Sequence, residues 1–158
     1  MARPIKWRKI ESLPNVTDFM PVGNNSDGYF RNVLLLEEFE ALRLKDLEGL
    51  EQEECALKME VSRPTFQRIL LSAREKMADS LVNGKGISIA GGTYTRNICN
   101  VKCMDCGNTW RDSYENLEKI KSGNYHCSKC DSPQVVCIED HQGRFCHGNC
   151  RRNGRNRR

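Results

Sequence analysis

Cysteine is the residue type whose number and spacing point most directly to chemistry in this sequence. The 158 residues include nine cysteines, and all except Cys55 lie between residues 99 and 150. Two Cys-x-x-Cys pairs, Cys103 with Cys106 and Cys127 with Cys130, are separated by 20 residues. Matched pairs at this spacing are typical of a site in which four thiolates surround one zinc ion. The sequence therefore predicts a structural Zn²⁺ bound by these four cysteines.

The same four side chains are compatible with two other chemistries. Four thiolates can hold iron, so the spacing leaves the identity of the metal open. A Cys-x-x-Cys pair can also be a redox dithiol, but such a pair normally occurs once, at the start of a helix. Catalytic zinc keeps an open coordination position, and four thiolates leave none. Two matched pairs therefore favour a structural metal site.

Five further metal-capable side chains follow the second pair. They lie within 14 residues and are Cys137, His141, Cys146, His147 and Cys150. Their spacings define no single four-ligand set, so they are candidates for a second metal site or for a metal- or redox-responsive switch. The alternative for Cys137 is a buried strand residue without a metal. Residues 144–158 hold six arginines and no acidic residue, which is typical of a disordered tail that attracts phosphate.

Short strands are expected to position the two cysteine pairs. Residues 109–110 after the first pair and 134–137 after the second have strand-like sequences, and Gly107 gives the backbone room to turn at the first pair. Two such turns capping a small sheet resemble a zinc ribbon. A segment this short buries too few apolar groups to fold alone. Metal binding would contribute on the order of 10 kcal/mol or more to its folding.

The first half of the chain has a helical pattern instead. Residues 1–33 are interrupted by prolines and by the turn-rich stretch 23–28, which predicts an arm and loops. Apolar residues three or four apart then predict three helices, at about 35–47, 52–59 and 62–82.

The third predicted helix begins at a clear signal. Ser62 is a good N-cap, and Pro64 lies in the first turn, where its missing N–H costs nothing. One face of this helix is expected to point into the core; its residues are Phe66, Ile69, Leu70, Ala73, Met77 and Leu81. The opposite face would then be polar at its start.

The second and third predicted helices, joined by a short turn, make a helix-turn-helix. Ala56 is small enough for the two helices to approach closely, and Val61 can fill the corner between them. The residues expected to point outward near the start of the third helix are Arg63, Thr65, Gln67 and Arg68. When such a helix enters a major groove, this end reaches the bases, and Arg can pair with guanine and Gln with adenine.

Further cations could contact phosphate groups. Arg74 lies on the third helix, and the N-terminal arm carries Arg3, Lys6 and Arg8 around Trp7. The spacing is also consistent with a helical hairpin whose polar face does not bind DNA, because helix-turn-helix shapes also occur in proteins that bind no DNA.

Long strings in this half are similar to a known family. They are Arg3-Pro-x-Lys-Trp-Arg8, Phe39-Glu-Ala-Leu-Arg-Leu44, Asp46-Leu-Glu-Gly-Leu50, Gln52-Glu-Glu54 and Val61-Ser-Arg-Pro-Thr-Phe-Gln-Arg68. Over residues 1–92 the chain resembles the UPF0251 (DUF134) family of small prokaryotic proteins. The resemblance implies a helix-turn-helix similar to the DNA-reading region 4 of sigma factors, and a regulatory role. It supplies no target sequence or ligand.

Two residues depart from the pattern of that family. Glu51 stands where a Ser cap is usual before the second helix, and a carboxylate suits a helix N-terminus electrostatically but caps it less well. Glu60 stands where a Gly is usual before Val-Ser. If Glu60 is left-handed, its side chain costs roughly 1 kcal/mol.

The composition divides the chain into two parts. Residues 1–86 carry 13 basic and 14 acidic side chains, a net charge of −1, whereas residues 87–158 carry 12 and 7, a net charge of +5. The Gly-rich stretch 83–92 is the expected junction. The sequence predicts an α+β protein with four parts: a basic arm and loops (1–33), a helix-turn-helix DNA-binding domain (34–92), a zinc-ribbon-like domain (93–140) and a Cys/His and Arg-rich tail (141–158).

Several classes of protein are disfavoured. No apolar run approaches the roughly 20 residues of a membrane helix, and the basic N-terminus has no apolar segment behind it, so neither a membrane protein nor a secreted one is expected. No nucleophile–base pair or phosphate-binding loop stands out, so we expect no enzyme. We expect a cytoplasmic protein that binds duplex DNA, as a homodimer or in contact with the transcription machinery. An RNA-binding or adaptor protein is the alternative.

Overall fold

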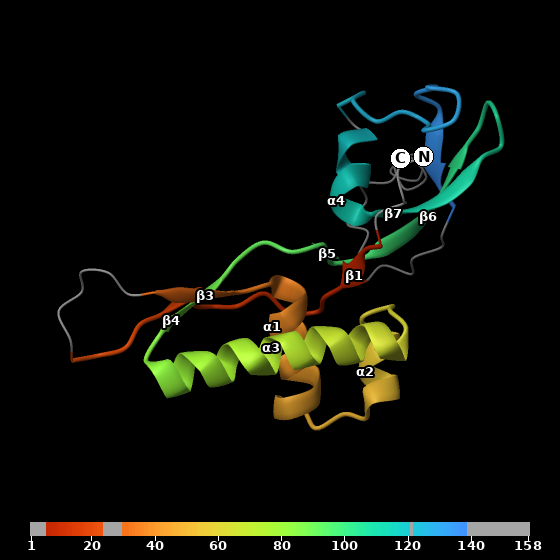
Figure 1. Cartoon of the computed structure of the whole chain (residues 1–158). Coiled ribbons are helices and arrows are strands. Elements are labelled where there is room, and N and C mark those ends of the chain that lie inside the picture. Colours follow the sequence, from red (N-terminus) through yellow and green to blue (C-terminus); the bar gives the residue numbers. More distant parts are fainter. Residues whose placement is uncertain (1–5, 24–29, 121, 139–158) are drawn as a thin grey trace, which may run out of the picture. The chain divides into compact units, whose positions relative to one another are not determined.

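The computed structural model describes residues 6–23, 30–120 and 122–138, and the chain divides into two compact units after Tyr94 (Figure 1). The fold is mixed α and β, as the sequence predicts. No helix in these described ranges is long and apolar enough to cross a membrane.

Three helical segments form the first part of unit 1. α1 (Leu36–Leu42) continues as one π-helical turn, η1 (Arg43–Leu47), and is followed by α2 (Gln52–Lys58) and α3 (Arg63–Asn83). They enclose a core of eight buried residues: Ala41, Leu44, Cys55, Ala56, Met59, Phe66, Ile69 and Leu70. The expected helices are therefore present, and the first half of the expected apolar face of α3 lies in this core.

The ends of α3 follow from its sequence. The Oγ atom of Ser62 accepts a hydrogen bond from the backbone N–H of Thr65 at 3.4 Å, which satisfies one of the free donors at the helix start. The helix stops at Gly84, whose left-handed conformation (φ +62°) suits glycine. Glu60, in the turn before α3, is also left-handed, with φ +53°, so the conformation expected from the Gly position of the family occurs here with a side chain.

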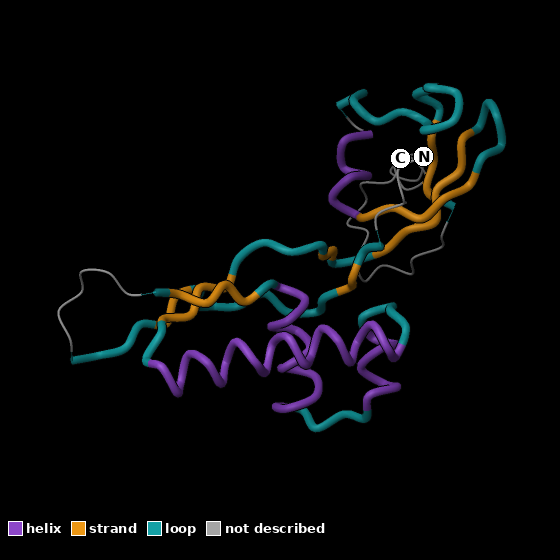
Figure 2. The backbone as a smooth tube through the Cα atoms, in the orientation of Figure 1, coloured by secondary structure: helices purple, strands orange, loops and turns teal. Residues whose placement is uncertain are grey.

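Unit 1 also contains a three-stranded sheet beside the second half of α3 (Figure 2). Its order is β2 (Asp18–Phe19), β4 (Gly86–Ile89) and β3 (Arg31–Leu34). β4 pairs antiparallel with β2 and parallel with β3. A separate two-stranded sheet pairs β1 (Arg8–Lys9) with β5 (Tyr94–Thr95), the strand in which unit 1 ends.

This sheet changes two expectations. The Gly-rich stretch that the composition suggested as the junction contains β4, the central strand of the sheet. Leu81, expected in the core, is 79% exposed, while Ser80 is buried. The reason is that the second half of α3 packs against the sheet: the side-chain amide of Asn32 on β3 donates to Ser80 Oγ at 2.9 Å and to the carbonyl of Lys76 at 3.1 Å. Near the C-terminal end of α3, the buried face of the helix therefore differs from the predicted one and includes Ser80 instead of Leu81.

Unit 2 is a small antiparallel sheet with one short helix. β6 (Ile98–Cys103) lies between β7 (Thr109–Ser113) and β8 (Val135–Cys137). α4 (Tyr114–Leu117) follows β7 and runs into a 3-10 turn, η2 (Glu118–Ile120). The buried face of this sheet is rich in sulfur, because Cys99, Cys103 and Cys137 join Val101 and Val135 in one cluster.

Candidate metal centre and candidate nucleic-acid interface

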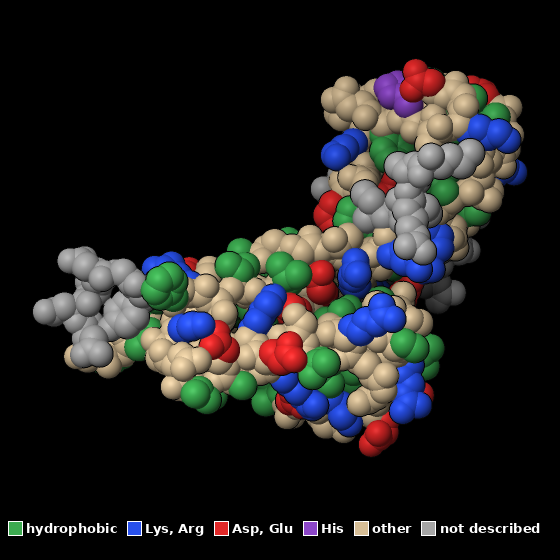
Figure 3. Space-filling view, in the orientation of Figure 1, with side chains coloured by type: hydrophobic (Ala, Val, Ile, Leu, Met, Phe, Trp, Pro, Cys, Tyr) green, Lys and Arg blue, Asp and Glu red, His purple; other side chains and the backbone are tan. Residues whose placement is uncertain are grey.

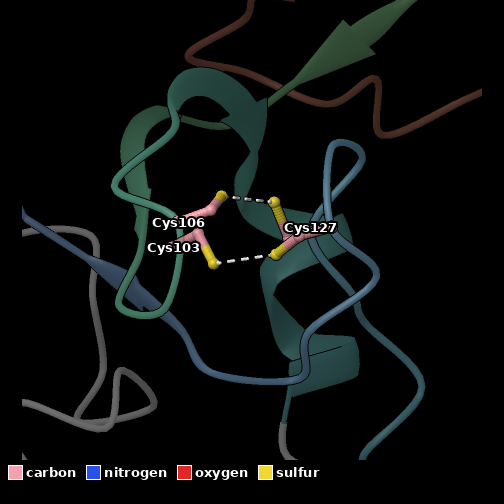
Figure 4. Close-up of side chains that lie close together, drawn as sticks. Cys103, Cys106 and Cys127 are labelled. Carbon is pink, nitrogen blue, oxygen red and sulfur yellow. Dashed lines mark hydrogen bonds between the residues drawn. The ribbon is translucent and has the colours of Figure 1, made fainter.

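Unit 2 brings together the four cysteines that the sequence singled out. The Sγ atoms of Cys103, Cys106, Cys127 and Cys130 all lie within 4.8 Å of one another. Cys103 contacts Cys130, and Cys106 contacts Cys127, each at 3.6 Å, so the nearest contacts run between the two pairs (Figure 4). All four are free thiols rather than disulfides. Cys103 and Cys127 are buried, and Cys106 and Cys130 are exposed.

Each pair lies on a tight turn with its own backbone hydrogen bonds. In the first turn, the N–H of Cys103 donates to the carbonyl of Asn108 at 2.9 Å. The N–H of Gly107 donates back to the carbonyl of Cys103 at 3.0 Å, with Gly107 in the left-handed region at φ +73°. This geometry directs both thiols of the turn to the same side (Figure 4).

The second turn repeats the hydrogen bonds of the first. The N–H of Cys127 donates to the carbonyl of Ser132, and the N–H of Asp131 donates to the carbonyl of Cys127, both at 2.9 Å. Asp131 is left-handed, with φ +57°, and so takes the place that Gly107 has in the first turn. Asp tolerates this conformation better than most residues. Two unrelated sequences thus form the same cysteine-bearing turn.

The local electrostatics favour the thiolate form at Cys103 and Cys127 but disfavour it at Cys130. The backbone N–H of Cys106 lowers the pKa of Cys103, against burial, which raises it. Burial raises the pKa of Cys127, but N–H groups of Lys129 and Cys130 and the neighbouring thiols bring it down to about 6. For Cys130 the N–H of Ser132 lowers the pKa, yet the adjacent thiols and burial raise it to about 12. Four negative sulfurs need a cation between them.

The separation of the sulfur atoms fits a single metal ion. At a metal–sulfur distance of about 2.3 Å, a tetrahedral site separates its sulfurs by roughly 3.8 Å. The observed closest contacts of 3.6 Å and the upper limit of 4.8 Å bracket that value. A disulfide would require about 2.05 Å. The residues present therefore suit one ion held by four sulfur ligands.

Two aromatic side chains pack beside the cysteine cluster. Trp110 and Tyr125 are half-buried against it, and the indole N–H of Trp110 donates to the Tyr125 hydroxyl at 2.9 Å. The Tyr125 hydroxyl in turn donates to the Asp112 carboxylate. Burial, together with this carboxylate, raises the pKa of Tyr125. These hydrogen bonds connect β7 to the segment just before the second cysteine turn.

The other metal-capable residues are placed differently. His126 is exposed, and it is not part of the cysteine cluster. Cys137 is buried on β8, opposite Val101. The remaining second-site candidates, His141, Cys146, His147 and Cys150, lie outside the described residues. Among the residues that the structure does describe, the four paired cysteines form the group that could hold a metal.

Unit 1 exposes the polar residues expected near the start of α3. Arg63, Gln67 and Arg68 are exposed, whereas Phe66 and Ile69 of the same turns are buried. Thr65 is half-buried, and its Oγ1 lies 2.8 Å from Ser62 Oγ. The Thr65 hydroxyl is therefore part of the helix cap.

Two of these residues contact the start of α2. Arg63 Nη1 lies 2.7 Å from a carboxylate oxygen of Glu53. Gln67 Nε2 donates to Gln52 Oε1 at 2.8 Å. In contrast, Arg68 makes no ion pair with any residue of the described chain. These partners are not predictable from the sequence, because helical spacing says nothing about which residue of α2 faces which residue of α3.

Arg74 forms a two-pronged ion pair further along α3. Its Nη2 and Nε atoms lie 2.6 and 3.1 Å from the two carboxylate oxygens of Asp46. The hydrogen bonds from Arg74 lower the pKa of Asp46. In the face of unit 1 that Figure 3 shows, basic and acidic side chains are accordingly interspersed over the helices.

The described part of the N-terminal arm lies against the turn between α2 and α3. The N–H of Lys9 donates to the carbonyl of Met59 at 2.9 Å, and the Lys9 ammonium lies 3.9 Å from the Glu60 carboxylate. Lys6 is exposed, and Arg8 is half-buried, with Nη1 donating to the Lys6 carbonyl at 2.8 Å. Arg3, the third candidate of this arm, lies outside the described residues.

The sequence is similar to proteins of one family. The model of the family described as "Protein of unknown function DUF134" matches residues 1–97. A UPF0251 protein of Clostridium novyi is 48% identical over 88% of this chain and 90% of its own length. A UPF0251 protein of Caldicellulosiruptor saccharolyticus is 45% identical over 96% of this chain and all of its own length. A UPF0251 protein of Clostridium botulinum is 43% identical over the whole chain and 94% of its own, so similarity extends across unit 2. No solved structure matches the chain.

Proposed function

The chain belongs to the UPF0251 (DUF134) family of proteins of unknown function, and we propose that it binds duplex DNA with the first turns of α3. In this proposal α2 and α3 are a helix-turn-helix similar to region 4 of sigma factors. An α-helix fits the major groove of B-DNA, and its N-terminal side chains then meet the edges of the bases. The role that follows is regulation of transcription.

One observation carries the proposal. The first turns of α3 present Arg63, Gln67 and Arg68 on the surface, while Phe66 and Ile69 anchor the same turns in the core. The helix is thus held by its buried face and exposes Arg and Gln near its beginning. These residue types pair with guanine, adenine and phosphate. The alternative of a purely structural polar face does not require these residue types.

The ion pairs and acidic residues around the start of α3 predict how strongly the protein binds DNA of arbitrary sequence. Arg63 and Arg74 are paired with Glu53 and Asp46, so each must exchange a carboxylate for a phosphate or a base. Arg68 has no carboxylate partner in the described chain to give up before it contacts a phosphate or a base. Because three carboxylates, those of Glu51, Glu53 and Glu54, lie at the start of α2, we expect weak binding to arbitrary DNA. Affinity would then come mainly from a matching sequence.

We further propose that the metal in unit 2 is zinc and that its role is structural. Four thiolates would fill all positions of a tetrahedral zinc ion, leaving no position for a substrate. The two cysteine turns over the β7-β6-β8 sheet resemble a zinc ribbon. Thiolate ligands remain reduced in the cytoplasm, which is the proposed location. Unit 2 would serve as a stable module for dimer formation, DNA contact or docking to the transcription machinery.

The test is selection of bound sequences from a random pool of DNA duplexes, followed by titration of the selected duplex and of a structured RNA. We expect one recurring duplex sequence and tighter binding to it than to RNA. Arg68→Ala should weaken that binding by about 1–3 kcal/mol. Arg31→Ala, which removes an exposed charge from β3, is the matched control and should bind as the wild type does. Preference for RNA, or no selected sequence, would contradict the proposal.

A further inference from the structure

The first turn of α2 contacts the first turns of α3 through an amide pair. Gln52, the first residue of α2, accepts through Oε1 a hydrogen bond of 2.8 Å from Nε2 of Gln67. The pair lies next to the Arg63–Glu53 ion pair, which joins the same two turns. These contacts connect the beginning of one helix to the exposed side chains at the beginning of the next.

The two glutamines differ in how firmly they are held. Gln52 is half-buried, and the helix behind it is anchored by Cys55, Ala56 and Met59, which are all buried. Gln67 is exposed. Gln52 is therefore the less exposed partner, on an anchored helix, and Gln67 is the side chain presented to solvent.

While Gln52 presents its oxygen, as it does in the structure, the hydrogen bond sets the direction of the Gln67 amide. A free glutamine can rotate its terminal amide and exchange the positions of oxygen and nitrogen. With Gln52 accepting one N–H, the nitrogen of Gln67 is held on the side of α2 and its oxygen on the other side. One N–H donor and the carbonyl oxygen of Gln67 remain for another molecule.

This remaining pattern matches one base. In the major groove adenine offers N7 as an acceptor and N6–H as a donor, whereas guanine offers two acceptors, N7 and O6. The oriented Gln67 amide can donate to adenine N7 and accept from N6–H. Opposite guanine its oxygen would face O6, and two acceptors repel each other. Fixing the amide therefore disfavours guanine as well as favouring adenine.

We propose that Gln52 is a positioning residue that orients Gln67 so that α3 selects adenine over guanine at one base pair. The proposal rests on the DNA-binding function proposed above. It adds a residue outside α3 to the determinants of sequence preference, and it predicts that the preference depends on an acceptor at position 52.

The experiment compares variants on the selected duplex and on a duplex with the corresponding A·T pair changed to G·C. Gln67→Ala should abolish the preference at that pair, a loss of roughly 5- to 150-fold in discrimination. Gln52→Ala should reduce the same preference while leaving affinity for unrelated duplex DNA unchanged. Gln52→Glu should restore it, because a carboxylate oxygen still accepts the N–H of Gln67. Leu81→Ala, an exposed truncation at the far end of α3, is the control and should keep the full preference.

Two different failures can be told apart. If the wild-type protein selects a sequence but Gln52→Ala keeps the full adenine preference, or Gln52→Glu does not restore what Gln52→Ala loses, the role of Gln52 is overturned and DNA binding stands. If the wild-type protein binds no duplex at all, the proposed function fails and this inference fails with it. Circular dichroism of each variant confirms that the helices remain folded.

Discussion

At Glu60 a side chain occupies a backbone conformation that glycine adopts most easily. Its φ of +53° reverses the chain between α2 and α3, and its carboxylate lies 3.9 Å from the Lys9 ammonium. That ion pair is partly exposed and contributes at most about 1 kcal/mol. The left-handed conformation costs a non-glycine residue roughly 1 kcal/mol. The strain and the ion pair are therefore of similar size and act in opposite directions on stability.

Comparing two substitutions at Glu60 isolates this strain. Glu60→Gly and Glu60→Ala both lose the contact with Lys9, but only glycine relieves the strain at φ +53°. We expect Glu60→Gly to be more stable than Glu60→Ala by about 1 kcal/mol in urea unfolding. Equal stability of the two variants, or a more stable alanine variant, would show that the turn is unstrained.

At the scale of elements, α3 has two halves with different partners. Its first half packs on α1 and α2, and its second half packs on β3 and β4. The first half was predictable, because Ser62, Pro64 and the spacing of Phe66, Ile69 and Leu70 are local signals. The second half was not, because its burial depends on strands from distant parts of the chain. β3 and β4 pair in parallel although they are about 50 residues apart, and β2 has only two residues, too few for a periodic pattern.

The joint between α3 and the sheet predicts a pH effect. Hydrogen bonds from Lys85, Asn32 and Asn83 lower the pKa of Asp79 from 3.8 to about 2. The unfolded chain therefore takes up this proton first as the pH falls. The contribution of Asp79 to stability is complete above the unfolded pKa and is lost as the pH drops from about 4 to about 2.

Asp79→Asn should flatten this part of the stability profile. The measurement is urea unfolding at several acidic pH values, followed through NMR amide signals of α3, so that protonation of the thiolates in unit 2 does not contribute. An unchanged slope between pH 4 and pH 2 in the Asn variant would mean that Asp79 does not tie α3 to the sheet.

At the scale of the whole molecule, the two units have different sources of stability. Unit 1 has two apolar clusters built from its helices and sheet, whereas the core of unit 2 is largely sulfur and valine. The gathering of four thiols was predictable from cysteine spacing alone, because two Cys-x-x-Cys turns have few other uses. The contacts of Gln52 and Glu53 with α3 were not predictable, because they depend on side-chain rotamers and on how two helices face each other.

Removal of the metal should unfold unit 2 and leave unit 1 folded. The purified protein should contain about one metal ion per chain, and a chelator should abolish the dispersed NMR signals of β6, β7 and β8. The signals of α3 should persist, since all four cysteines of the cluster lie in unit 2. Structural zinc sites of this kind contribute roughly 10–16 kcal/mol, so little folded sheet should remain. Cys106→Ser should act in the same direction as the chelator, and a unit 2 that stays folded without metal would exclude a structural role for the ion.

The central claim, that the start of α3 contacts duplex DNA, is tested most directly by a footprint on the selected duplex with the Arg63→Ala and Arg68→Ala substitutions combined. The wild-type protein should protect one defined site, and the double variant, with its helices intact by circular dichroism, should lose that protection. An unchanged footprint would contradict the account, because it would mean that the exposed face of α3 does not touch the DNA.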